Sequence, residues 1–269
     1  GNNTSIIMKD REVQEINTGN SLGIRIRVLN NGAWGFAYTN DLSKLDEIAE
    51  TSIKISNSLK GDESLSKADI IQDKVSTDVK IPFSDVSIEE KKEIMSEASK
   101  AASLKEVTST TVSYSDSQSQ EVILSSEGTS IEMNTNRVAM FLNAAARDGT
   151  MMQTGHNSIG GVKGFEAISD EDIEAFGRKI GEKAVRLLKA ESAPSGRFPI
   201  IADPNLTGVF VHEALGHAVE GDLILQNDSI LKDKLGSKIG SDIVNIYDDA
   251  SLKDGFGYYP YDVEGVKTK

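Results

Sequence analysis

The chain has 269 residues, which is long enough for two or three modules with hydrophobic cores of their own. Its net charge of −13 argues against a protein that binds the DNA backbone, and the absence of cysteine excludes disulfides and cysteine-based metal sites within these residues. No apolar run approaches the roughly 20 residues that a transmembrane helix needs, and no signal-peptide pattern is visible, so we expect a soluble cytoplasmic protein.

Residues 1–62 are expected to form a small N-terminal α+β module. Alternating apolar and polar side chains predict strands over residues 5–9, 12–16, 22–29 and 33–38. Asn31-Gly32 is a frequent hairpin-turn sequence and predicts that the last two strands pair. Apolar residues at helical spacing predict a helix over 43–60, and the polar stretch 61–80 is expected to be a linker.

Residues 80–191 are expected to form a central α+β module. Ser87 and Glu90 make a capping box, which predicts a helix that runs to about residue 102. An antiparallel β-meander should follow, with strands over 108–114, 121–124, 130–133 and 138–142 and with turns at 127–128, 134–136 and 148–149.

The second half of this module contains a glycine-rich stretch and a long helix. Residues 155–164 match neither a phosphate-binding loop nor a dinucleotide fingerprint, so we expect a mobile connection with His156 in a turn rather than in a metal site. Ser169 is positioned to cap a helix over 170–191, whose apolar residues at helical spacing predict a core-facing stripe.

Residues 195–269 are expected to be the start of a C-terminal domain. A short buried strand over 198–202 and a tight turn should lead into a helix that begins at Asp203-Pro204. A strand, a tight turn and a helix form a rigid support, and this helix carries the candidate metal ligands.

His212 and His217 are two of the three histidines in the chain, and Glu213 directly follows the first of them. Neutral imidazoles are good zinc ligands, and an adjacent carboxylate can accept a proton from a water whose pKa the metal has lowered. The alternative is two unrelated histidines on a core helix, but the adjacent glutamate and the scarcity of other histidines favour a metal centre.

The spacing of the two histidines predicts an irregular helix. The common HExxH motif separates its histidines by roughly 40° around a helix, whereas the HExxxH spacing of His212 and His217 gives about 140°. A single π-type turn would bring positions i and i+5 into near register, and Gly216 lies where such a distortion is easiest.

Two carboxylates follow the second histidine. Glu220 and Asp222 either orient the imidazoles as hydrogen-bond acceptors or are solvated at the end of the helix. In a continuous helix Glu220 would lie roughly 12 Å along the axis from His212, too far to share a metal ion unless the helix ends before it.

The chain also resembles the TldD/PmbA family of metallopeptidases along its whole length. The stretches that carry the resemblance are 23–28, 31–37, 201–204, 212–222, 248–249 and 262–265. The most specific stretch is His-Glu-Ala-Leu-Gly-His with the glutamate and aspartate that follow it. It is similar to the TldD branch, whereas the PmbA branch usually lacks intact metal ligands.

The resemblance implies a zinc-dependent hydrolase of peptides or unfolded proteins, with His212 and His217 as ligands and Glu213 as general base. It implies a homodimer or a heterodimer with a PmbA-like subunit, and nothing points to nucleic acid or a membrane as a partner. The family's third ligand is a C-terminal cysteine that this chain lacks, and members run beyond its last residue. We therefore expect a truncated chain that is inactive alone.

Two alternatives remain open at this point. One is a non-catalytic scaffold subunit of a TldD/PmbA-type complex, which would keep the motif without turnover. The other is a dipeptidyl peptidase with the same i, i+5 spacing, although that class takes a third ligand from a later acidic helix that has no match here.

Overall fold

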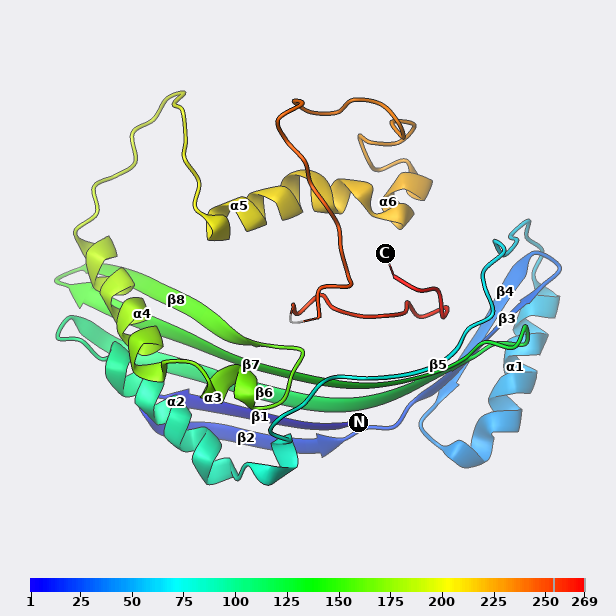
Figure 1. The fold of residues 1–269 in the computed structure, drawn as a ribbon, viewed down its shortest axis with the longest axis horizontal. Helices are drawn as coiled ribbons and strands as arrows, with labels where there is room; N and C mark the ends of the chain where they lie inside the picture. Colours follow the sequence, from blue (N-terminus) through cyan, green and yellow to red (C-terminus); the bar gives the residue numbers. More distant parts are fainter. Residues whose placement is uncertain (254, 269) are drawn as a thin grey trace. The chain divides into compact units, whose positions relative to one another are not determined.

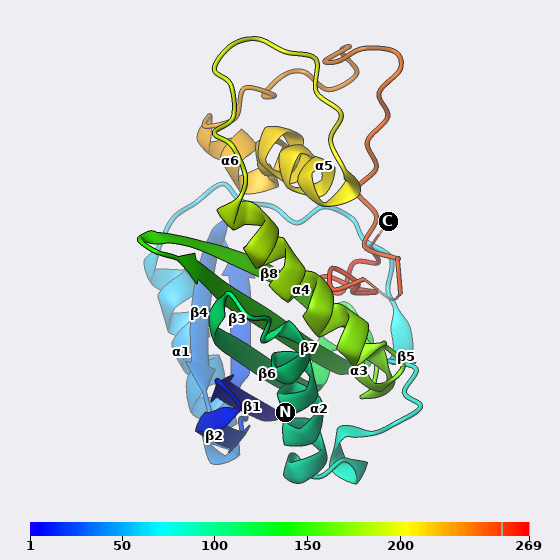
Figure 2. The same ribbon diagram turned by 90° about the vertical axis from the view of Figure 1, so that its left-hand side faces the viewer.

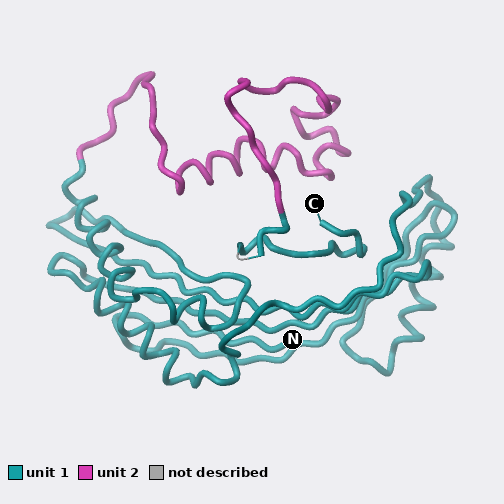
Figure 3. Tube along the Cα trace, in the orientation of Figure 1, with its two compact units in different colours: residues 1–190, 250–269 teal, residues 191–249 magenta. Residues whose placement is uncertain are grey.

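The computed structural model describes residues 1–253 and 255–268. The chain divides into two compact units (Figure 3): the first comprises residues 1–190 together with 250–269, and the second comprises residues 191–249. Strands and helices are mixed and the strands pair mostly antiparallel, which confirms the α+β class.

The first unit is built around one large sheet (Figure 1). Its strands are β1 (Asn2–Lys9), β2 (Glu12–Asn20), β5 (Gln72–Ser76), β6 (Val107–Leu124), β7 (Ser130–Asp148) and β8 (Met151–Gly161). The order is β2-β1-β6-β7-β5, and β8 also pairs with β7. All pairs are antiparallel except the parallel pair of β5 and β7.

The two predicted N-terminal hairpins belong to different sheets. The hairpin of β1 and β2 extends the large sheet, because β1 pairs with β6 along its whole length. The hairpin of β3 (Ile24–Asn30) and β4 (Ala33–Thr39) is a separate sheet that packs on α1 (Leu45–Ser58). Its Asn31-Gly32 turn forms as predicted, with φ of 48° and 72°.

Two helices lie side by side across one face of the large sheet (Figures 1 and 2). They are α2 (Ile88–Ala102), which begins with the predicted capping box at Ser87, and α4 (Ile173–Leu188). The absence of a side chain at Gly177 allows the two helices to approach closely, since a Cβ there would lie 2.3 Å from the carbonyl oxygen of Ala98. The core between sheet and helices includes Ile6, Met95, Val112, Met140, Leu142, Ile168, Phe176 and Ile180.

The central strands are longer than predicted, and the helix cap differs. The strands expected at 130–133 and 138–142 are one continuous strand, β7, and those at 108–114 and 121–124 are both part of β6. The turn predicted at 134–136 is wrong, because these residues pair with β6 in unbroken register. Ser169 is not the cap of α4: Asp172 accepts the hydrogen bond from Ala175 N–H at 2.9 Å, and Ser169 ends the short helix α3 (Glu166–Ser169).

Two stretches predicted to lack regular structure contain strands. The linker 61–80 includes β5, and the glycine-rich stretch 155–164 continues β8. His156 therefore lies in a strand and not in a turn, and its ring stacks on Phe141 with centroids 6.0 Å apart. Gly155 is needed for packing, since a Cβ there would lie 2.3 Å from the carbonyl oxygen of Ile180 in α4.

The second unit contains α5 (Pro204–Val211) and α6 (Gly221–Gln226). The buried strand predicted over 198–202 is wrong: these residues have no regular structure and are exposed. None of the helices in the described ranges combines the length and the hydrophobicity that crossing a bilayer requires.

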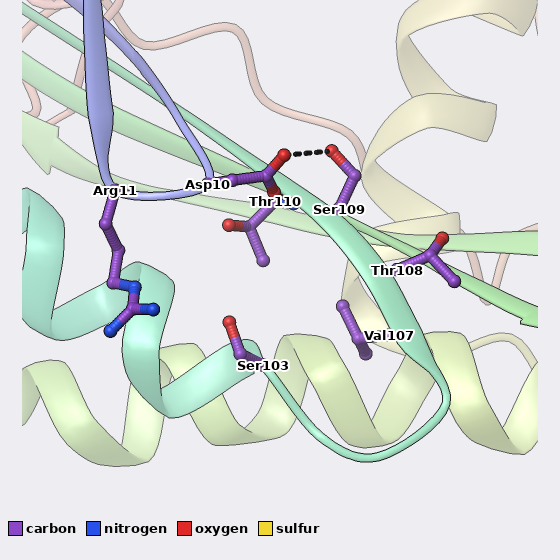
Figure 4. Close-up of a pocket in the computed structure, with 7 residues that line it drawn as sticks. All are labelled: Asp10, Arg11, Ser103, Val107, Thr108, Ser109 and Thr110. Carbon is purple, nitrogen blue, oxygen red and sulfur yellow. Dashed lines mark hydrogen bonds between the residues drawn. The ribbon is translucent and has the colours of Figure 1, made fainter.

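The turn between β1 and β2 is fastened to β6 by Asp10 (Figure 4). Asp10 Oδ1 accepts a hydrogen bond from Thr110 N–H at 2.7 Å, and Oδ2 accepts one from the Ser109 hydroxyl at 3.2 Å. A hollow of about 160 Å³ lies beside this turn. Since both carboxylate oxygens hold the hairpin, we assign Asp10 a structural role.

Glu166 is a buried carboxylate that accepts three backbone hydrogen bonds, from Ile81 N–H (2.9 Å), Gly164 N–H (3.0 Å) and Lys80 N–H (3.2 Å). Burial is the largest single influence and raises the pKa of this carboxyl group, but the backbone hydrogen bonds together outweigh it and hold the pKa below its usual range. A lowered pKa in the folded state stabilises the protein above the unfolded pKa of about 4.3, and this stabilisation is lost as the pH falls through the folded pKa.

We expect Glu166→Gln to lower the free energy of unfolding by about 1–3 kcal/mol at neutral pH, because an amide has one acceptor oxygen and leaves buried N–H donors unpaired. The fall in stability below about pH 4 should also become shallower, since the titrating group is gone. Urea unfolding across this pH range measures both effects. Glu174→Gln is the matched control, because Glu174 is exposed and pairs with Arg178 on the helix surface. Identical acid slopes for the parent and Glu166→Gln would contradict the assignment.

Candidate metal centre

The helix that carries the candidate ligands begins as predicted. Asp203 Oδ1 accepts a hydrogen bond from Leu206 N–H at 2.8 Å, and Pro204 occupies the first helical turn, where its missing N–H costs nothing. The start of α5 is therefore fixed at one place in the sequence, and this sets the rotation of the residues that follow.

The helix is irregular at the histidines, as their spacing predicts. Residues His212–Gly216 form a π turn, in which His217 N–H bonds to the carbonyl oxygen of His212. Gly216 keeps helical backbone angles, with φ −52° and ψ −56°, and a Cβ there would meet His212 Nδ1 at an ordinary contact distance of 3.7 Å. The backbone of the turn thus does not demand glycine at this position.

The π turn brings the three candidate side chains together. Each of His212, Glu213 and His217 offers one ligand atom, and these atoms all lie within 4.8 Å of one another. The two imidazole rings are in edge contact, with centroids 4.5 Å apart and an angle of 70° between their planes. Among residues 1–253 and 255–268 this is the one group of three or more such side chains that could hold a metal ion.

Glu220 contacts the second histidine. The helix ends at Val219, and Glu220 adopts an extended backbone with φ −60° and ψ 128°, so its side chain turns back toward the helix. Oε1 of Glu220 lies 2.6 Å from Nδ1 of His217. An ionised carboxylate can only accept, so Nδ1–H donates, and in the neutral imidazole this leaves the lone pair on Nε2 of His217. Nε2 of His217 lies 3.9 Å from Oε2 of Glu213, which belongs to the same group of potential ligands.

The other sequence candidates lie apart from this group. Asp222 is in the first turn of α6 and is not a member of the cluster of potential ligands, and neither is His156. The i, i+3 spacing of His217 and Glu220 was the sequence signal for the contact that does form. The side chains of the group are open to solvent, with His217 49% and Glu213 65% exposed.

The donor set fits zinc. Imidazole nitrogens and a carboxylate oxygen are among the ligands that zinc takes in proteins, and a histidine whose other ring nitrogen donates to a carboxylate is typical of zinc sites. Protein zinc sites have at least three protein ligands as a rule, and two imidazoles from one helix supply two of them. This group therefore offers part of the donor set of a zinc site.

Three family models together match most of the chain. They describe PmbA/TldA metallopeptidase domain 1 at residues 1–56, the central domain at residues 81–188 and the C-terminal domain at residues 195–269. The chain belongs to the PmbA/TldD family of metallopeptidases.

Curated relatives are similar along nearly the whole chain. A metalloprotease of Methanothermobacter thermautotrophicus is 55% identical over 98% of this chain and 58% of its own length. A metalloprotease of Methanocaldococcus jannaschii is 41% identical over 100% of this chain and 60% of its own length. A protein of Saccharolobus solfataricus that is 28% identical, over 99% of this chain and 58% of its own length, is named a zinc metalloprotease TldD homolog. The chain thus spans about three fifths of the length of these relatives.

Solved structures share the fold. A crystal structure of a Thermotoga maritima protein matches with a TM-score of 0.81 at 23% identity, over 100% of this chain and 61% of that protein. At this level of identity the likeness establishes the architecture alone.

Proposed function

We propose that this chain carries the ligand helix of a zinc-dependent metallopeptidase of the TldD type, which hydrolyses peptides or unfolded proteins. The observation that supports it best is the π turn, because it gathers His212, Glu213 and His217 within 4.8 Å although their sequence spacing would separate the histidines in a regular helix. The family membership and the names of the relatives support the same reaction class.

Each residue of the centre has a distinct proposed role. His212 and His217 hold the metal through imidazole nitrogens, and Glu220 fixes the ring orientation and tautomer of His217. A bound zinc ion polarises a peptide carbonyl group and lowers the pKa of a water molecule. Glu213 accepts the proton of the attacking water and delivers it to the leaving amine. This role does not require Glu213 to be a metal ligand.

A third ligand is expected from outside this helix. The exposed group also needs surrounding walls, because catalytic metal sites work in cavities that exclude bulk water. We propose that further polypeptide supplies both the ligand and the walls, so residues 1–269 should bind zinc weakly and lack peptidase activity. The experiment compares this chain with a polypeptide of the relatives' full length, before and after zinc removal by a chelator.

We expect peptide hydrolysis from the full-length polypeptide, its loss with the chelator and its return with zinc. Equal and tight zinc affinity of both polypeptides would mean that the third ligand already lies within residues 1–269. A zinc-loaded full-length polypeptide that cleaves no peptide would instead favour the alternative function, a scaffold subunit of a TldD/PmbA-type complex.

The contact of Glu220 with His217 makes a separate prediction. We expect Glu220→Ala to weaken zinc binding by about 10–100-fold, the usual effect of removing the acceptor that orients a ligating histidine. Asp222→Ala is the matched control: it removes a carboxylate two residues further along, in α6, and leaves the contact of Glu220 with His217 in place. Calorimetric titration of zinc into both variants of the full-length polypeptide measures the two affinities. If the two weaken binding equally, general charge and not orientation is responsible.

We also propose a dimer, either of two identical chains or with a PmbA-like subunit, in the cytoplasm. The edge strand β2 supports the dimer, because all nine of its residues are exposed and unpaired strand edges are suited to association. Sedimentation of the full-length polypeptide at micromolar concentration should give the mass of a dimer, and a monomer under these conditions would oppose the proposal.

A further inference from the structure

The large sheet has a second, open face that is lined by small polar side chains. The register places Asn3, Ser117 and Arg137 in one row across β1, β6 and β7, and Ser5 and Ser115 in the next row. Directly paired residues share a face of a sheet, and so do residues two apart along a strand. These rows therefore point away from α2 and α4, which cover Ile6, Tyr114 and Met140 on the other face.

A pocket of about 360 Å³ lies on this open face. Its lining includes the two polar rows, and Phe256 contributes an aromatic side that is half exposed. Phe256 belongs to the C-terminal segment of the first unit, which returns across the sheet next to β7 (Figure 1). The volume lies within the range of small-molecule pockets, at roughly 300–1,000 Å³.

Arg137 is the one cation among the residues that line this pocket, and its guanidinium contacts a neutral carbonyl group. One N–H of its guanidinium donates to the carbonyl oxygen of Tyr258 at 3.1 Å, and no ion pair within residues 1–253 and 255–268 includes it. Asp116 also lines the pocket, but it lies on the opposite face of β6, where Lys91 Nζ and the Tyr114 hydroxyl each contact its Oδ2 at 2.7 Å. The guanidinium therefore retains N–H groups for a ligand.

We propose that this pocket binds a carboxylate group, carried by a small organic acid or by the C-terminal residue of a peptide. A guanidinium matches the flat fork of a carboxylate with two parallel hydrogen bonds, and the serine hydroxyls and the Asn3 amide can complete its hydrogen bonding. Phe256 offers an apolar surface for the body of the ligand. A phosphate is disfavoured, because one guanidinium in a chain of net charge −13 is a weak match for a doubly charged anion.

The test uses three probes and metal-free protein, so that the candidate metal centre cannot contribute. The probes are propionate, acetyl-Ala-Ala with a free carboxylate, and acetyl-Ala-Ala amide, and ligand-detected NMR measures their binding up to about 10 mM, which covers weak affinities. We expect saturable binding of a carboxylate probe and none of the amide. Tighter binding of acetyl-Ala-Ala than of propionate identifies a peptide C-terminus as the ligand, and equal affinities identify a small acid.

The variants assign the binding to Arg137. We expect Arg137→Gln to weaken carboxylate binding by about tenfold or more, because a charge-assisted bidentate bond is lost. Arg137→Lys should retain part of the affinity. Arg147→Gln is the control, since Arg147 lies exposed on the same strand, and thermal unfolding checks that each variant is folded. The proposal is overturned if neither carboxylate probe binds, if the amide binds equally, or if Arg137→Gln binds as the parent does.

Discussion

Replacing Glu213 by glutamine is expected to lower peptide hydrolysis by about 10²–10⁴-fold, the usual contribution of a general base, while zinc stays bound. Glutamine keeps the size and shape of the side chain but cannot accept the proton of the attacking water. The proposed ligands are the imidazoles of His212 and His217, which this change leaves in place. The measurement is the kcat of a polypeptide of the relatives' full length, together with its zinc content.

The comparison variant for this experiment is Asp228→Asn. Asp228 is an exposed carboxylate of the same unit and is not a member of the candidate metal group. The activity of the Asp228→Asn variant should therefore stay within a few-fold of the parent. Turnover of Glu213→Gln at that same level would remove Glu213 from the role of general base. Loss of zinc from Glu213→Gln would instead make it a ligand.

Lys91→Ala is expected to lower the free energy of unfolding by about 3–5 kcal/mol, the usual effect of removing one partner of a buried ion pair. Lys91 on α2 and Asp116 on β6 are 3% and 6% exposed, and Lys91 Nζ lies 2.7 Å from Asp116 Oδ2. The alanine variant leaves a buried carboxylate with the Tyr114 hydroxyl as its remaining partner. Burial, followed by this hydrogen bond, raises the pKa of Tyr114, so the phenol stays neutral and cannot replace the lost cation's charge.

Urea unfolding measures this effect, and Lys92→Ala is the matched control. Lys92 is the neighbouring residue and pairs with Glu89 on the helix surface at 3.5 Å, so its loss should change stability by less than about 1 kcal/mol. The triple replacement Lys91→Met, Asp116→Leu and Tyr114→Phe should recover most of the loss, because neither an unpaired charge nor the Tyr114 hydroxyl without its acceptor remains buried. Equal stabilities of Lys91→Ala and Lys92→Ala would show that the pair is not buried in solution.

The local features of the candidate centre were predictable because they depend on residues close in sequence. The i, i+5 spacing of His212 and His217 is incompatible with one metal ion on a regular helix, and the structure resolves the conflict with a π turn. The caps at Asp203 and Ser87 follow in the same way from hydrogen bonds within one helical turn.

The strands were harder to predict because pairing decides them. Residues 134–136 have the composition of a turn, but their backbone groups pair with β6 as part of a strand of 19 residues. Polar residues are compatible with this strand because its second face is open. The predicted strand at 198–202 is the reverse case: its side chains are apolar, but no strand among the described residues pairs with it.

Contacts between residues far apart in the chain could not be predicted from the local sequence pattern either. The parallel strand β5 lies in a polar stretch without periodicity and forms by pairing with β7, where Lys74 contacts Glu132 at 2.9 Å. The open pocket at Arg137 depends in the same way on strands and on a C-terminal segment that are far apart in the chain.

We propose above that the π turn allows His212 and His217 to share one zinc ion. The most direct measurement is anomalous scattering at the zinc absorption edge from crystals of the zinc-loaded, full-length polypeptide. We expect a single zinc ion bonded to an imidazole nitrogen of each histidine, with the π turn retained over His212–Gly216. Zinc bonded to only one of the two histidines, or an unbroken α-helix from residue 208 to 220 beside a bound zinc ion, would contradict it.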